Sequence, residues 1–107
     1  MTDELRQRIQ SLVATHKIVI FMKGTKVFPM CGFSASAVAV FHELGVPFET
    51  VNILEDPELR EGIKEFSNWP TIPQVYLAGK FVGGADIVRE MYESGELQPL
   101  VQSALAA

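Results

Sequence analysis

Residues 18–34 read IVIFMKGTKVFPMCGFS, and this stretch decides the fold. Its first part, Ile18 to Met22, is apolar and rich in β-branched side chains, which predicts a strand buried on both faces of a sheet. Residues 25–30 then form a loop, and from about Gly32 to Gly45 apolar positions return at helical spacing. The only cysteine, Cys31, is therefore expected where a loop meets the start of a helix.

Further elements are expected on both sides of this stretch. A helix capped by Thr2 precedes the first strand, since its apolar residues recur on one face. After Gly45 we expect a strand over 48–53 and then a helix that Asp56 caps and Pro57 begins. A rigid turn over 68–73 is followed by a hairpin, whose strands 74–77 and 80–82 are joined by Ala78-Gly79. Gly83-Gly84 then opens a helix that ends at Ser94-Gly95, and a last helix starts at about Leu97.

The order of these elements constrains the topology. A helical crossover makes the first two strands parallel, whereas the hairpin makes the last two antiparallel. We therefore expect an α/β protein with a central four-stranded mixed sheet and helices on both faces. The length of 107 residues suits one domain spanning residues 1–107.

Composition excludes several classes of function. The formal net charge of -4 argues against a nucleic-acid partner or a polybasic membrane contact, because both need a cationic face. No apolar run approaches the roughly 18 residues of a membrane span, and the first residues lack the layout of a signal peptide. A cytoplasmic location is expected.

The single cysteine limits the chemistry further. It excludes an internal disulfide, a CxxC redox pair and a zinc or iron–sulfur site that one chain builds alone. At a helix start, free N–H groups favour the Cys31 thiolate, and Lys23 adds positive charge. The alternative is a small buried hydrophobic residue. A Cys–His hydrolase is disfavoured, because His42 lies about 16 Å along the helix and His16 precedes the strand.

Two later segments complete the candidate site. Ile72-Pro73 lies in a turn that runs into a strand, a common place for a cis proline, although the sequence does not assign the isomer. A cis bond there would leave the Ile72 backbone free to pair with an extended peptide. The Gly83-Gly84-Ala85-Asp86 segment offers backbone N–H groups that could bind a carboxylate. The alternative is that it is only the end of the hairpin and the start of a helix that Asp86 caps. Arg60 and Lys64, with Lys23, form a cationic rim or are solvated surface charges.

Taken together, Lys23-Gly24, the CGFS of residues 31–34, the WPTIP of residues 69–73 and Gly83-Gly84-x-Asp86 resemble the monothiol, CGFS-type glutaredoxins of the thioredoxin fold, in their short single-domain class. The resemblance covers nearly the whole chain and implies that glutathione lies extended across the site. Lys23, Arg60 and Lys64 would hold its glycine carboxylate. Ile72 would pair with the backbone of its cysteinyl unit, and Ala85 and Asp86 would take its γ-glutamyl end.

The resemblance also implies a metal cargo. A [2Fe-2S] cluster needs four ligands, and two chains would supply Cys31 twice while two glutathiones supply the rest. This homodimer would act as an iron–sulfur cluster carrier. The alternatives are a glutathione-dependent monothiol reductase and an iron- or redox-sensing module with a BolA-type partner. Enzymatic activity is expected to be weak at most: Ala85 replaces the second cysteine of many relatives, and the spacer of residues 25–29 is expected to steer glutathione away from the geometry of attack.

Overall fold

The computed structural model describes all 107 residues. The elements are five α-helices, four strands and one short 3-10 turn. In chain order they are α1 (Asp3–Thr15), β1 (Ile18–Met22), α2 (Gly32–Leu44), β2 (Glu49–Asn52), η1 (Ile53–Glu55), α3 (Pro57–Ser67), β3 (Gln74–Leu77), β4 (Lys80–Gly83), α4 (Ala85–Ser94) and α5 (Leu97–Ala106).

The strands form one mixed sheet in the order β2-β1-β3-β4. β1 pairs parallel with β2 and antiparallel with β3, and β3 pairs antiparallel with β4. The predicted four-stranded mixed sheet is therefore confirmed. Because β1 is central, the residues that follow it emerge from the middle of the sheet edge, which is where Cys31 is attached.

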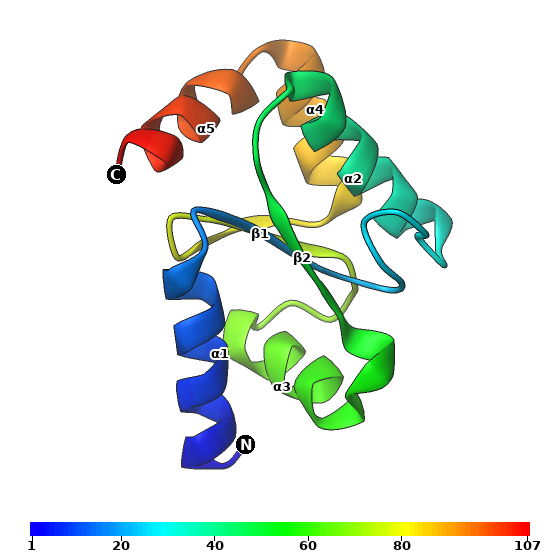
Figure 1. Ribbon diagram of the computed structural model, residues 1–107, viewed down its shortest axis with the longest axis vertical. Helices are drawn as coiled ribbons and strands as arrows, with labels where there is room; N and C mark the ends of the chain where they lie inside the picture. Colours follow the sequence, from blue (N-terminus) through cyan, green and yellow to red (C-terminus); the bar gives the residue numbers. More distant parts are fainter.

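The central strand separates two apolar cores. Val19 and Phe21 pack with side chains of α1 and α3 on one face. Ile18, Ile20 and Met22 pack with α2, α4 and α5 on the other face. Figure 1 shows α1 and α3 below the sheet and the other three helices above it. All five residues of β1 are buried, as an apolar strand between two helical layers requires.

Local signals place most helix ends. The Thr2 hydroxyl accepts a hydrogen bond from Leu5 N, and the Asp56 carboxylate accepts one from Leu59 N, so both predicted caps are confirmed. α2 ends at Leu44, and its C-cap residue Gly45 has a left-handed φ of 68°. No helix has both the length and the apolar character needed to cross a bilayer.

Two predicted boundaries are wrong. The strand expected over 48–53 extends only from Glu49 to Asn52, because Asn52 caps the η1 turn with its side chain. The fourth helix begins at Ala85 instead of Gly83, since Gly83 belongs to β4 and Gly84 is the N-cap. Asp86 therefore does not cap the helix, and the alternative that gave it this role is wrong.

Candidate functional site

Cys31 is the N-cap residue of α2. Its thiol is free and partly exposed, so the alternative of a wholly buried cysteine is wrong. The backbone N–H of Ser34 is the main group that lowers the pKa of Cys31, with help from the N–H of Phe33 and the charge of Lys23, while burial opposes them. The predicted preference for a thiolate at this helix start has these physical causes.

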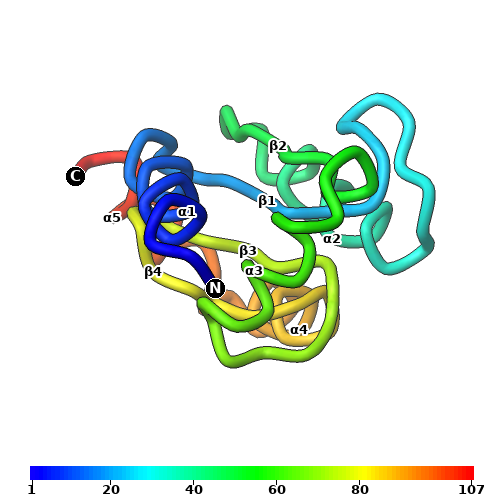
Figure 2. The backbone as a smooth tube through the Cα atoms, turned by 90° about the horizontal axis from the view of Figure 1, so that it is seen from below, coloured from blue at the N-terminus to red at the C-terminus, as the bar shows by residue number.

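The loop before Cys31 is fixed at both ends by hydrogen bonds. Gly24 N donates to Asn52 Oδ1 at 3.0 Å, and Met30 N donates to Lys23 O at 2.9 Å. Lys23 N donates to Ser34 Oγ at 3.1 Å. The end of β1 is therefore joined to both β2 and the first turn of α2. Figure 2 shows the loop projecting at the right-hand edge of the molecule, beside the start of α2.

Gly24 allows this arrangement. Its φ is 93°, and a Cβ there would lie 2.5 Å from Phe28 O and 2.6 Å from Met30 N. No side chain tolerates both the backbone conformation and such contacts with backbone atoms. Gly24 therefore sets how closely the loop folds back on the strand end.

The Ile72-Pro73 peptide bond is cis, the isomer that the sequence left open. Neither backbone polar group of Ile72 takes part in the protein's loop and turn hydrogen bonds. The loop is tied down from within, since the buried Gln74 amide donates to Trp69 O at 3.1 Å and Thr71 O at 3.3 Å. The Ile72 backbone is thus held by its neighbours, with its own hydrogen-bonding groups unused.

This loop and the start of α4 enclose a small hollow with a volume of about 180 Å³. Ile72, Ala85 and Asp86 all line it, together with Phe33 from the first turn of α2. The two walls meet at Gly84, where a Cβ would lie 3.3 Å from Pro73 O and 3.5 Å from Trp69 Nε1. Three of the six residues predicted to bind glutathione therefore gather in one hollow, which Phe33, two residues after Cys31, also lines.

The three cationic residues predicted to bind glutathione have different surroundings. Lys23 is close enough to Cys31 to lower the pKa of the thiol, and neither it nor Arg60 forms an ion pair. Arg60 and Lys64 do not line the hollow around Ile72. Lys64 is paired with Glu61 at 3.1 Å and borders a second hollow beside Trp69 and Pro70.

Two buried donors near these segments have no partner in the protein. They are Arg60 Nε and the indole Nε1 of Trp69. A buried donor without a partner is costly, so such atoms mark places where a ligand or water completes the hydrogen bonding.

The histidines do not contribute to the thiol site. His42 packs edge-on against Phe48, with 5.1 Å between ring centroids, and neither histidine is among the groups that shift the pKa of Cys31. Nothing in the structure pairs the cysteine with a histidine base.

Sequence reasoning missed three residues that build the site: Ser34, Asn52 and Gln74. Each has a local signal, because Ser34 lies three residues after an N-cap, Asn52 ends a strand, and Gln74 is a polar residue after a proline in an otherwise apolar strand. These signals indicate a hydrogen bond to backbone but not which segment provides it. The partners come from distant segments only once the chain has folded.

Comparison with known proteins adds independent information. The glutaredoxin family profile matches residues 18–82. A monothiol glutaredoxin of Synechocystis is 55% identical over 107 residues, which is the whole of both chains. A chloroplastic monothiol glutaredoxin of Arabidopsis thaliana is 51% identical over 107 residues, and there the chain spans 62% of the relative's length.

Solved structures share the fold. The holo form of glutaredoxin C1 from a poplar hybrid, Populus tremula x tremuloides, superposes with a TM-score of 0.88 at 26% identity, covering 98% of this chain and 93% of that one. A buckwheat glutaredoxin–glutathione complex gives a TM-score of 0.84 at 26% identity, covering 97% of this chain and 96% of that one.

Proposed function

The chain belongs to the monothiol glutaredoxins, and from this premise we propose that it binds glutathione beside Cys31 and, as a dimer, carries a [2Fe-2S] cluster to other proteins. We rest this on one arrangement: a single thiol, partly exposed and with a lowered pKa, stands at a helix start next to a hollow lined by Ile72, Ala85 and Asp86.

The site suits an extended tripeptide that has carboxylates at both ends. Ile72 offers an unused backbone N–H and C=O, which is what strand-like pairing with a peptide needs. The start of α4 at Ala85 and Asp86 offers N–H groups to one carboxylate. The unpaired charges of Lys23 and Arg60 suit the other.

We test glutathione binding by calorimetric titration of single variants. Arg60→Gln and Lys23→Gln are expected to weaken binding by about tenfold or more each, since a hydrogen bond to a charged group is worth about 1.5 to 3 kcal/mol. Lys64→Gln should matter less, because Lys64 is already paired with Glu61. Equal losses in all three variants, or none, would contradict the assignment of these cations.

A cluster fits the donor set only when two chains combine. Each chain supplies one thiolate, and no three His, Cys, Asp or Glu side chains gather within it to hold a metal. Two copies of Cys31 and two glutathione thiolates make the four ligands of a [2Fe-2S] centre. Because half of these ligands are exchangeable, the protein can release such a cluster, which suits a carrier that passes it to other proteins.

An exposed apolar surface next to the thiol supports pairing with a second chain. Val27, Phe28, Met30 and Phe33 lie within four residues of Cys31, and these residues are 91%, 72%, 63% and 62% exposed. Apolar groups this exposed and this close together indicate a contact surface. A BolA-type partner would use the same surface in place of the second copy.

The carrier role has its own test. The cluster-loaded protein is mixed with an apo-ferredoxin, and the appearance of the ferredoxin's spectrum is followed after the two are separated. Transfer supports the carrier. A cluster that stays with this protein in the presence of a BolA-type partner would favour a sensing module instead.

The lowered pKa of Cys31 also supports the second candidate, a monothiol reductase. The Cys31 thiolate would attack the glutathione sulfur of a mixed disulfide, release the protein thiol, and itself become glutathionylated. A second glutathione thiolate would then attack, restoring Cys31 and releasing oxidised glutathione. Turnover of a glutathionylated substrate at the rate of a dithiol glutaredoxin would favour this activity over the carrier.

A further inference from the structure

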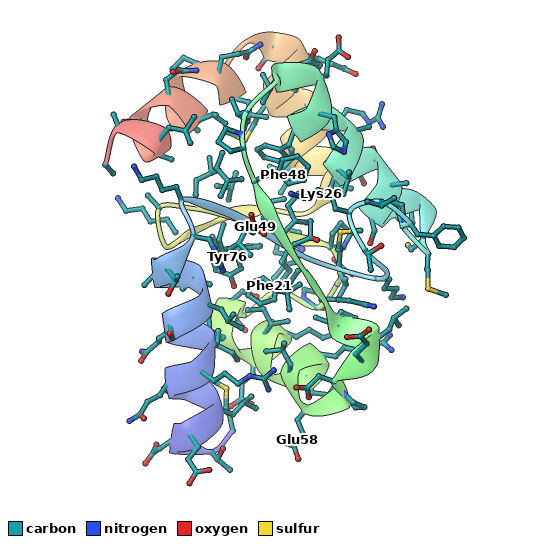
Figure 3. The ribbon with its side chains drawn as sticks, in the orientation of Figure 1. Phe21, Lys26, Phe48, Glu49, Glu58 and Tyr76 are labelled. Carbon is teal, nitrogen blue, oxygen red and sulfur yellow. The ribbon has the colours of Figure 1, made fainter.

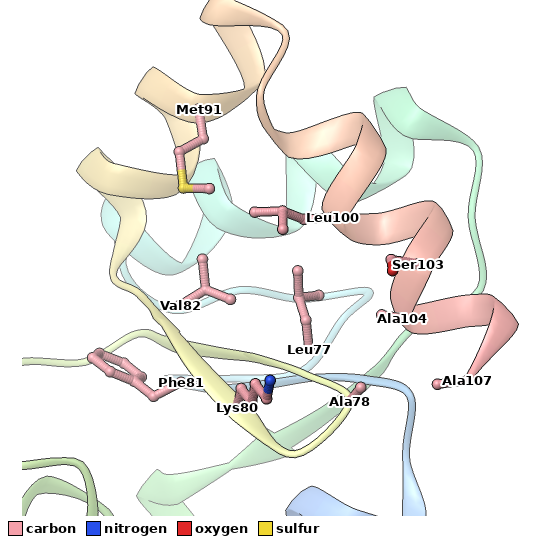
Figure 4. A pocket seen from close by; sticks show the side chains of 10 residues that line it. All are labelled: Leu77, Ala78, Lys80, Phe81, Val82, Met91, Leu100, Ser103, Ala104 and Ala107. Carbon is pink, nitrogen blue, oxygen red and sulfur yellow. The ribbon is translucent and has the colours of Figure 1, made fainter.

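Gln74 is the first residue of β3, and its polar side chain is completely buried. Side chains alternate between the two faces along a strand, so Gln74 shares a face with Tyr76 and not with Leu77. Figure 4 shows the other face, where Leu77 is directed toward Leu100 of α5. Gln74 therefore projects toward the face that α3 covers, and the loop of residues 68–73 leaves the end of α3 on that face.

The side-chain amide of Gln74 joins this loop to the core. Its NH2 group donates to the backbone carbonyl oxygens of Trp69 at 3.1 Å and Thr71 at 3.3 Å. Its own oxygen accepts a hydrogen bond from the Tyr76 hydroxyl at 3.2 Å. Because carbonyl oxygens only accept, the NH2 group must face the loop and the amide oxygen must face Tyr76. An apolar side chain of the same size could hold neither carbonyl.

The direction of the Thr71 carbonyl decides which way Ile72 faces. The peptide bond between these two residues is trans and planar, so its C=O and N–H groups point in opposite directions. With the Thr71 carbonyl held inward by Gln74, the Ile72 N–H is directed outward. Ile72 is extended because a proline follows it, and in an extended residue the C=O points to the same side as the N–H. Both polar groups of Ile72 are therefore directed away from the core.

On the premise of the glutathione binding proposed above, we propose that Gln74 is a positioning residue for glutathione. It holds the Thr71 carbonyl inward and thereby presents the Ile72 N–H and C=O to the backbone of the cysteinyl unit. Gln74 itself does not line the hollow at Ile72, so it acts only through the loop. Its role is to order the loop before glutathione arrives, which removes an entropy cost from binding.

Calorimetric titration with glutathione compares the unmodified protein with two variants. Gln74→Met keeps the size of the side chain but removes both donors to the loop. Binding should weaken about 5- to 30-fold, the range expected when one backbone residue must be ordered by the ligand. Tyr76→Phe is the matched control, because it removes a hydrogen bond from the same amide but leaves both donors in place. It should lower the stability of the fold and leave the affinity for glutathione nearly unchanged.

A modified ligand separates positioning from a general loss of structure. Glutathione that is N-methylated at its cysteinyl amide cannot donate to the Ile72 carbonyl, so it should bind the unmodified protein more weakly than glutathione does. Gln74→Met should weaken the binding of this ligand by a smaller factor, since part of the contact that Gln74 prepares is already missing. Equal factors for the two ligands would mean that the variant only disturbs the fold, and the proposal would be wrong.

NMR of the unmodified protein gives a test that needs no variant. The side-chain amide protons of Gln74 should exchange slowly with water both before and after glutathione is added, whereas the backbone amide of Ile72 should shift on binding. Fast exchange of the Gln74 amide in either state would contradict the proposal. If the unmodified protein does not bind glutathione, the proposed function is wrong and this inference with it. If Gln74→Met binds glutathione as tightly as the unmodified protein, this inference alone is wrong.

Discussion

The ammonium of Lys26 lies over the ring of Phe48, with 4.4 Å from Nζ to the ring centroid. The same ammonium donates a hydrogen bond to the Phe48 carbonyl oxygen. Figure 3 labels both residues and shows them together near the middle of the molecule. Lys26 belongs to the loop that ends at Cys31, and Phe48 to the chain that enters β2, so one side chain connects the loop to the edge of the sheet.

Replacing Lys26 should loosen that loop without unfolding the protein. Lys26→Met removes both the cation–π contact and the hydrogen bond, worth together about 1 to 2 kcal/mol. Amide hydrogen exchange at Thr25 and Phe28 should then become faster by about tenfold, whereas exchange in β3 should not change. Lys26→Arg retains the charge and is the matched control. If Lys26→Met leaves loop exchange unaltered, the contact does not hold the loop.

Replacing Gly24 should cost more stability than replacing Gly45, another glycine with a left-handed backbone conformation. Gly24→Ala combines a positive φ with Cβ contacts of 2.5 and 2.6 Å to backbone atoms, so the free energy of unfolding should fall by about 3 kcal/mol or more. Gly45→Ala is the control, since Gly45 has a φ of 68° but open space around it, and about 1 to 2 kcal/mol is expected. Urea denaturation measures both, and similar losses would show that the close contact at Gly24 is unimportant.

The thiol of Cys31 should react at lower pH than an ordinary cysteine. The pKa is lowered chiefly by the Ser34 backbone N–H, with smaller contributions from Phe33 and Lys23, so the midpoint of the alkylation rate against pH should lie below that of an unperturbed cysteine. Lys23→Met should move the midpoint up only slightly, because Lys23 is a minor cause of the lowered pKa. A midpoint at or above that of free cysteine would contradict the electrostatics of the site.

Tyr76 should make the fold sensitive to high pH. Burial raises the pKa of Tyr76 to about 12, and its hydroxyl donates to Gln74 Oε1 at 3.2 Å. The folded state holds this proton more tightly than the unfolded state, whose tyrosine titrates near 10. The resulting stabilisation is complete below pH 10 and is lost between about 10 and 12, by about 3 kcal/mol.

Comparison with Tyr76→Phe isolates this effect. The variant should be less stable by about 1 kcal/mol at neutral pH, since it leaves the Gln74 oxygen without that donor, but it should lose less stability on going to high pH. Denaturation at a series of pH values gives both curves. Parallel curves would mean that Tyr76 does not carry the alkaline transition.

The sequence anticipates elements that depend on local chemistry. The apolar run Ile18–Met22, the caps Thr2 and Asp56, and the Ala78-Gly79 turn each depend on neighbouring residues, and each is found where expected. Ala78 and Gly79 have φ values of 49° and 81°, as a tight two-residue hairpin turn requires. The order of these elements was enough to predict the mixed sheet.

Features that depend on contacts between distant segments were not predictable in the same way. The Asn52 side chain ends the second strand by accepting hydrogen bonds from Leu54 N, two residues on, and from Gly24 N in a distant segment, and no local pattern reveals the second partner. The contact of Lys26 with Phe48 and the ion pair of Lys64 with Glu61 likewise need the folded chain. Of the predicted cations, only Lys64 is already paired, a distinction that charge patterning alone cannot make.

Anaerobic reconstitution with iron, sulfide and glutathione tests the central claim most directly, read by visible absorption and size exclusion on the same sample. The unmodified protein should give a coloured dimer, and Cys31→Ser a colourless monomer. Withdrawal of glutathione should bleach the dimer and return it to monomers. If Cys31→Ser takes up as much iron and sulfide, or if colour forms equally well without glutathione, then the shared ligation by two chains and two tripeptides is wrong.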